Sequence, residues 1–126
     1  MDLALANAIA VRILRGAGAS DHHLGFYSKD EDGTIEVVPY ITNLLKVLAE
    51  ADEPTVHARL AFSVAISVVV GDQPAIVVRY SCIDEPHETA FTPEGRAWRP
   101  HESLEPQVAV QVSGRTLLRI AKAALS

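Results

Sequence analysis

Residues 55–70 alternate between bulky apolar side chains and other side chains without interruption. A period of two is typical of a β-strand, because successive side chains leave opposite faces of the ribbon. One face would be bulky and apolar, whereas the other is polar at its start and then small. The pattern therefore predicts one long strand, with one face on a core and the other open to a groove or a partner.

Helical spacing of apolar residues predicts three amphipathic helices. The first would run over residues 3–15 with Asp2 as its cap, and the last over residues 114–124 with Ser113 as its cap. The second would start at Pro39 and end before residues 52–54. Residues 16–20 would form a flexible joint after the first helix.

Shorter alternating stretches predict further strands. They are expected over residues 23–28, 34–38, 75–83, 87–92, 96–99 and 108–112. Matching the bulky faces of residues 55–70 and 75–83 pairs Ile66 with Tyr80 and Ser67 with Arg79. The predicted fold class is a two-layer α+β domain over residues 1–126. It has a mainly antiparallel β-sheet with the three helices packed on one face.

Charge and composition narrow the classes of partner. The formal net charge is −5 and the pI is near 5.4, which argues against a nucleic-acid binder that uses a general basic surface. No run reaches the roughly 18 apolar residues that a membrane span requires. Residues 1–15 lack the basic start and unbroken apolar run of a signal peptide. We therefore expect a cytoplasmic protein. The single cysteine, Cys82, cannot form an intramolecular disulfide, which is compatible with a reducing compartment.

The small-residue face of the central strands is the first candidate binding surface. A guanidinium among hydroxyl groups can hold a carboxylate or phosphate. Contact with a partner or a second subunit, plain solvent exposure and a small ligand all fit such a face. The candidate residues are His57, Arg59, Ser63, Ser67, Arg79 and Ser81.

The segment 87–101 is the second candidate surface, because tryptophan and arginine are enriched at binding hot spots. With residues 93–95 as its turn, the segment would form a projecting hairpin. Its candidate residues are Phe91, Arg96, Trp98 and Arg99. The alternative is that Phe91 and Trp98 close the edge of the core.

The residues that could form a catalytic or metal-binding motif also have simpler structural interpretations. Cys82 with His57 or His87 as base would be a nucleophile, but a position on the apolar side of a strand favours a buried thiol. Adjacent histidines His22 and His23 would point to opposite faces of a strand, and no helix carries a metal-ligand spacing. The sequence therefore predicts no catalytic residue, no metal site and no cofactor.

Three hypotheses about function follow. The leading one is a non-catalytic protein-binding module of regulatory, adaptor, or inhibitor or immunity type. Its partner would be another protein with a basic surface, and it would form a homodimer through the small-residue face. The second is an enzyme or small-ligand binder with a pocket between sheet and helices, using Arg79, Tyr80, His57 or His87. The third is a subunit of a larger viral or secretion assembly.

Overall fold

The computed structural model describes residues 2–82 and 85–125, excluding the side chains of His57, Ala58, Leu60, Ala61, Phe62 and Cys82. The helices are α1 (Leu3–Gly16), α2 (Asp21–Leu24), α3 (Val37–Glu50), α4 (Pro54–Ser63) and α5 (Gly114–Leu125). The strands are β1 (Tyr27–Asp30), β2 (Gly33–Glu36), β3 (Val64–Val70), β4 (Ala75–Cys82), β5 (Glu85–Phe91) and β6 (Val108–Ser113). Two short 3₁₀ helices, η1 (Pro93–Gly95) and η2 (Pro100–Glu102), lie between β5 and β6.

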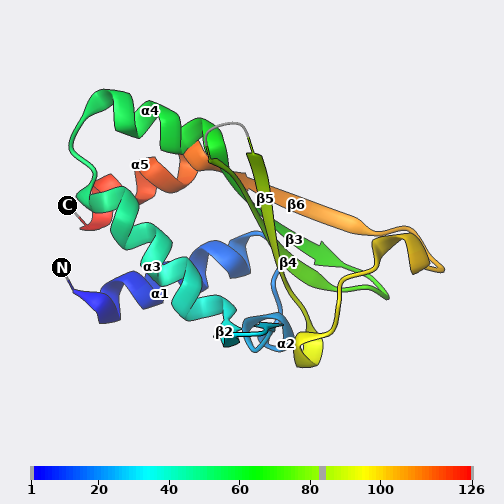
Figure 1. Cartoon of the computed structure of the whole chain (residues 1–126). Helices are drawn as coiled ribbons and strands as arrows, with labels where there is room; N and C mark the ends of the chain where they lie inside the picture. Colours follow the sequence, from blue (N-terminus) through cyan, green and yellow to red (C-terminus); the bar gives the residue numbers. More distant parts are fainter. Residues whose placement is uncertain (1, 83–84, 126) are drawn as a thin grey trace.

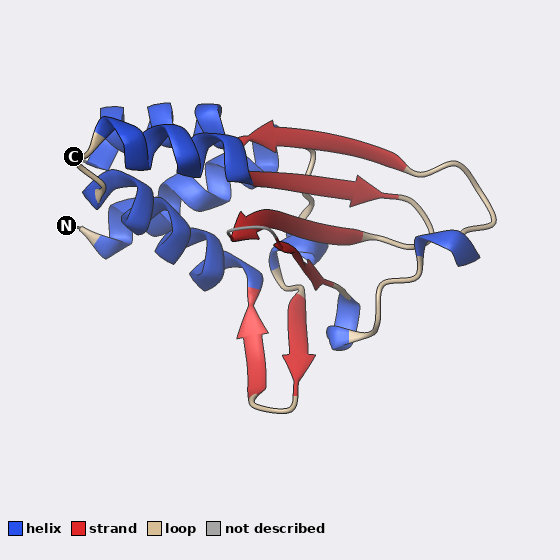
Figure 2. Ribbon diagram, turned by 45° about the horizontal axis from the view of Figure 1, so that its top comes forward, coloured by secondary structure: helices blue, strands red, loops and turns tan. Residues whose placement is uncertain are grey.

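The strands form two separate antiparallel sheets. The larger is four-stranded in the order β5-β4-β3-β6, and β1 and β2 form a small hairpin beside it (Figure 2). The long helices gather over one end of the larger sheet, and the opposite end extends beyond them (Figure 1). This arrangement confirms the predicted α+β fold with two layers and a mostly antiparallel sheet.

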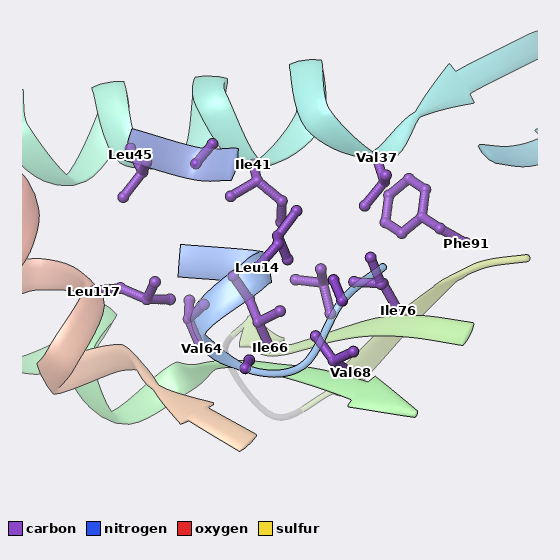
Figure 3. Close-up of a cluster of buried hydrophobic side chains, with 14 of the residues drawn as sticks. Leu14, Val37, Ile41, Leu45, Val64, Ile66, Val68, Ile76, Phe91 and Leu117 are labelled. Carbon is purple, nitrogen blue, oxygen red and sulfur yellow. The ribbon is translucent and has the colours of Figure 1, made fainter. Parts of the chain in front are cut away.

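The core lies between the larger sheet and helices α1, α3 and α5. Leu14 and Ile41 from the helices meet Ile66 and Ile76 from the sheet, and all four are completely buried (Figure 3). Phe91 of β5 completes this layer and contacts the ring of Tyr40, with 5.2 Å between the ring centroids. Burial of these apolar side chains is the main force that holds helices and sheet together.

The prediction of one strand over residues 55–70 is wrong in its first half. Helix α4 occupies Pro54–Ser63, and only Val64–Val70 is strand. Pro54 stands at the start of the helix, where its missing N–H costs nothing, and good helix formers such as Ala58 and Leu60 follow it. The strand starts where β-branched residues become dense, and its seven residues match the usual length of a strand.

The predicted register of the central hairpin is displaced by two residues. In the structure Ile66 pairs with Val78, Val64 with Tyr80, and Ala65 rather than Ser67 lies opposite Arg79. A two-residue shift keeps every side chain on its predicted face, because side chains alternate with a period of two. The prediction of faces is therefore right although the pairs are wrong.

Two predicted strands are replaced by other structures. Residues 23–28 divide between helix α2 and strand β1, because Ser20 caps a helical turn instead of starting a strand. Residues 96–99 are not a strand, so the predicted projecting hairpin over residues 87–99 does not form. After β5, Glu94 and Gly95 both adopt positive φ, and the chain turns away along the sheet.

The two predicted N-caps are confirmed, whereas the helix predicted to start at Pro39 already starts at Val37. The carboxylate of Asp2 accepts hydrogen bonds from the backbone of Ala4 and Leu5, and the hydroxyl of Ser113 accepts one from Thr116 N. Lys122 of α5 donates to the carbonyl of Ala49 at 2.9 Å and so caps the C-terminal end of α3. Among the described residues, no helix is long and apolar enough to cross a membrane.

Candidate functional site

The outer face of the larger sheet is the face that points away from the helices, and it carries the odd-numbered residues of β3. The half of this face next to the turn between β3 and β4 is covered by the segment of the chain that connects β5 to β6. Trp98 packs there on Val69 and Val77, and its indole N–H donates to the carbonyl of Gln73 at 3.2 Å. This half of the face is therefore a small second core and not an open surface.

The other half of the outer face is hollowed into a depression of about 970 Å³, which we call the outer groove. Ala65 lies across from Arg79 on one side and Ser113 on the other, so a small side chain occupies the middle of the groove. Around it are hydroxyl, amide and charged groups, which belong to Ser63, Ser81, Glu88, Gln111, Ser113 and Arg115.

Arg79 is the central charged residue of the outer groove. Its Nε lies 2.8 Å from Glu88 Oε2 on the neighbouring strand, and the two side chains are 53% and 45% exposed. The pair is thus accessible to solvent and contributes at most about 1 kcal/mol to stability. Arg115, in the first turn of α5, brings a second guanidinium to the groove. The groove therefore combines cationic groups with hydroxyl donors, which suits carboxylate or phosphate groups.

The groove residues of β6 and α5 could not be predicted as part of this site. Alternation of Val108, Val110 and Val112 predicts a strand, but it does not say which strand lies next to it. In the structure β6 returns to pair with β3, which places Gln111 opposite Ser67 and brings Arg115 to the groove. That pairing joins segments far apart in the sequence.

His87 and Tyr80 also line the outer groove, and the ring of this histidine is engaged with the tyrosine. His87 pairs with Tyr80 and its ring stacks on that tyrosine at 5.0 Å, on the face opposite to Ser81. On the same side, burial and the neighbouring Tyr80 raise the pKa of Tyr40. Among the described residues, no group of three histidine, cysteine or acidic side chains could hold a metal ion.

The structure brings together part of the predicted sheet-face set. Ser63, Arg79 and Ser81 line the outer groove. Ser67 is on the same face but only 7% exposed. Arg59 is wrongly placed by the prediction, because it lies exposed on α4. The backbone of His57 also lies in α4, and its side chain is outside the described residues, as is that of Cys82.

The predicted hairpin set divides into two residues that pack in the interior, Phe91 and Trp98, and two that are exposed, Arg96 and Arg99. Phe91 is completely buried in the main core, which corrects its proposed exposure to a partner. Arg96 and Arg99 are exposed and line a second depression with Trp98. Glu94 lies 4.0 Å from Arg96, and Glu102 lies 3.4 Å from Arg99. Among the described residues, four acidic ones line this depression beside its two arginines, whereas Glu88 is the one acidic residue beside Arg79 and Arg115 in the outer groove. The second depression is therefore a weaker candidate for binding an anionic group.

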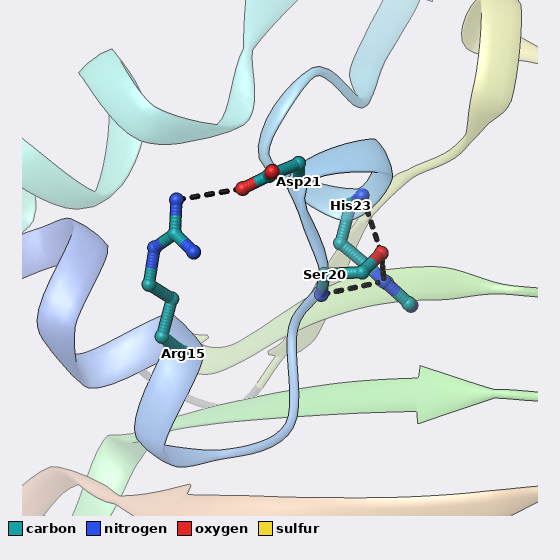
Figure 4. Close-up of polar contacts among 4 residues, drawn as sticks. All are labelled: Arg15, Ser20, Asp21 and His23. Atoms are coloured by element: carbon teal, nitrogen blue, oxygen red, sulfur yellow. Dashed lines mark hydrogen bonds and ion pairs between the residues drawn. The ribbon is translucent and has the colours of Figure 1, made fainter.

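A buried histidine that the sequence analysis left unassigned joins α2 to the sheet. His23 Nδ1 accepts from the backbone N–H of Ser20 and lies 2.8 Å from its hydroxyl (Figure 4). With Nδ1 as acceptor, Nε2 carries the proton and donates to the carbonyl of Val69 at 3.0 Å. The Ser20-x-x-His23 spacing resembles a capping box, which was the available sequence signal.

Asp72 anchors the loop that leads into β6. Its carboxylate accepts from the hydroxyl of Ser103, from Leu104 N at 2.7 Å and from the amide of Gln107 at 2.6 Å. The hydrogen bond from Ser103, followed by that from Leu104, lowers the pKa of Asp72 below its ordinary value of 3.8. These bonds favour the charged carboxylate, so the anchor is complete above the ordinary pKa and is lost as the pH falls through the lowered one.

We expect the amide proton of Leu104 to titrate with Asp72, with a midpoint below 3.8, because protonation removes the acceptor. An NMR titration from pH 6 to pH 2 measures this directly. The variant Asp72→Asn should abolish the titration and shift the Leu104 resonance already at pH 6. A midpoint above 3.8 in the wild-type protein would contradict the anchor.

The outer groove is thus an open site on the larger sheet in which two arginines and several hydroxyl groups lie together. Its lining comes from all four strands of the larger sheet and from α4 and α5 at one end. Comparisons of this chain with protein-family models, with curated proteins and with solved structures found no match.

Proposed function

We propose that this protein is a non-catalytic protein-binding module of regulatory, adaptor or inhibitor type, acting in the cytoplasm. The observation that carries the proposal is the division of the outer sheet face. The chain covers one half with Trp98 and leaves the other half as an open, polar groove around Arg79.

The groove favours an extended acidic segment of a partner protein. Arg79 and Arg115 supply guanidinium groups, and Ser63, Ser81 and Ser113 supply hydroxyl donors. Charge-assisted hydrogen bonds from these groups to carboxylates contribute about 1.5–3 kcal/mol each. The overall charge of −5 would still favour a partner that also carries basic residues, which would face the acidic surface outside the groove.

Selection from a random-peptide display library tests this function. Peptides rich in Asp and Glu are expected to be enriched on the immobilised protein. The affinity of one synthesised peptide is then measured by calorimetry for the wild type and for Arg79→Gln. Loss of one charge-assisted contact should weaken binding about tenfold or more.

Arg119→Gln is the matched control, because Arg119 is exposed on α5 and is not among the groove residues. Its affinity should stay within about twofold of the wild type. Failure to enrich any peptide would contradict the proposal. An equal loss in both variants would also contradict it, since that result indicates unspecific attraction between charges.

A further inference from the structure

We propose that the free edge of β6 pairs with β6 of a second copy of this chain, forming a symmetric dimer with one continuous sheet. β6 is the last strand of the order β5-β4-β3-β6 and has a strand neighbour on one side only among the described residues. Its outward N–H and C=O groups are a template for another strand. This inference concerns the edge of the sheet and not its outer face, although Arg115 also lines the outer groove.

The two edges of the sheet differ in how they are protected. The β5 edge carries Pro86 and the charged residues Glu85 and Glu88, and its end is bridged to the β1 hairpin between Tyr27 and Thr92. Proline and charge are the usual means by which proteins prevent strand addition. β6 contains no proline and no charged residue along Val108–Ser113. Only the β6 edge is therefore suited to pairing.

The exposed side chains of β6 also favour a partner strand. Val108 and Val110 are 62% and 45% exposed, and Val70, which pairs with Val108, is 44% exposed. Because Val108 and Val110 are two positions apart on β6 and Val108 stands opposite Val70, the three side chains share one face of the sheet and form an apolar row. Neighbouring valines of a second strand would cover this row.

The charges that flank β6 indicate that the second strand is another copy of this chain in antiparallel orientation. Antiparallel pairing centred on Val110 places Val108 opposite Val112 and Ala109 opposite Gln111. The same arrangement would put the loop with Glu105, before the strand, at the same end of the joined strands as Arg115 of the other copy, in the first turn of α5. Both residues are exposed, so the twofold symmetry would bring opposite charges to both ends of the joined strands. A parallel arrangement would instead align like charges.

The antiparallel dimer also keeps the helices apart. The long helices gather at the end of the sheet where β6 leads into α5, and the other end carries the segment between β5 and β6 with the short helix η2 (Figure 1). A twofold axis through Val110 puts the helices of the two copies at opposite ends of the joined sheet. Both bulky faces then lie on the same side, because paired residues of an antiparallel ladder share a face.

The mass of the purified full chain in solution tests the dimer. Size-exclusion chromatography with light scattering should give twice 13.6 kDa for the wild type at about 100 µM, a concentration at which protein dimers of micromolar Kd are populated. Val110→Lys places two ammonium groups opposite each other on the twofold axis and should give the monomer mass. The control Val47→Lys changes a valine of similar exposure, 47%, on α3 and should remain dimeric.

A charge exchange tests the register. Glu105→Arg and Arg115→Glu should each raise the dimer Kd about threefold or more, and the double variant should restore it. A monomeric wild type would overturn the proposal. A dimer that persists in Val110→Lys would also overturn it. A dimer that dissociates in Arg79→Gln would overturn it too, because its interface would then lie at the outer groove. Oligomers larger than a dimer would overturn it as well, because the proline and charged residues of the β5 edge should prevent a third copy from pairing there.

Discussion

Replacement of Phe91 by alanine is expected to lower the free energy of unfolding by about 3–5 kcal/mol. The ring is completely buried in the main core and meets Tyr40 on α3. Its removal leaves a cavity between β5 and that helix, which the surrounding strands can fill only in part. Urea denaturation followed by circular dichroism measures the loss.

Leu104→Ala is the matched control, because Leu104 is 97% exposed. Removal of this side chain should change the stability by no more than about 0.5 kcal/mol. A loss of less than about 1 kcal/mol for Phe91→Ala would contradict its place in the core. It would support the earlier expectation that Phe91 serves a binding surface.

Replacement of His23 by alanine is expected to cost about 2–4 kcal/mol. The variant removes the contacts of the ring with Ser20 and leaves the buried carbonyl of Val69 without the donor at Nε2. It also removes a ring that lies 4.9 Å from that of Phe26. The link between α2 and strand β3 would therefore be lost together with packing.

His22→Ala provides the comparison, because His22 is the adjacent residue of the same type but is exposed. Its ring makes an edge contact with Phe26, so its loss should cost less than about 1 kcal/mol. Hydrogen exchange of the α2 and β3 amides adds a local measurement. Equal stability losses in the two variants would show that the buried hydrogen bonds of His23 contribute little.

The fold class and the caps of α1 and α5 could be predicted because they depend on periodic patterns and on neighbours in the sequence. Asp2 and Ser113 cap helices through contacts with residues two or three positions away. The alternation in residues 64–70 assigns each side chain to a face, and the assignment survives a register error of two residues. Caps and side-chain faces are local properties, so the sequence pattern is enough to predict them.

The first half of residues 55–70 shows where a local pattern is insufficient. Alternation predicts a strand there, but proline at the start and helix formers after it favour α4. Packing of α4 against α5, which lies at the other end of the chain, adds to that preference. His57 and Arg59 were therefore assigned to the sheet face although their backbone is helical.

The sequence by itself determined the α+β class, the helix caps and the face on which each sheet residue lies. Only the tertiary structure decided that β6 returns to β3, and with it the outer groove around Arg79 and the free edge at Val110. It also decided that Trp98 covers half of the open face. The physical reason is that strand partners are selected by burial and hydrogen bonding between distant segments, which depend on the whole fold.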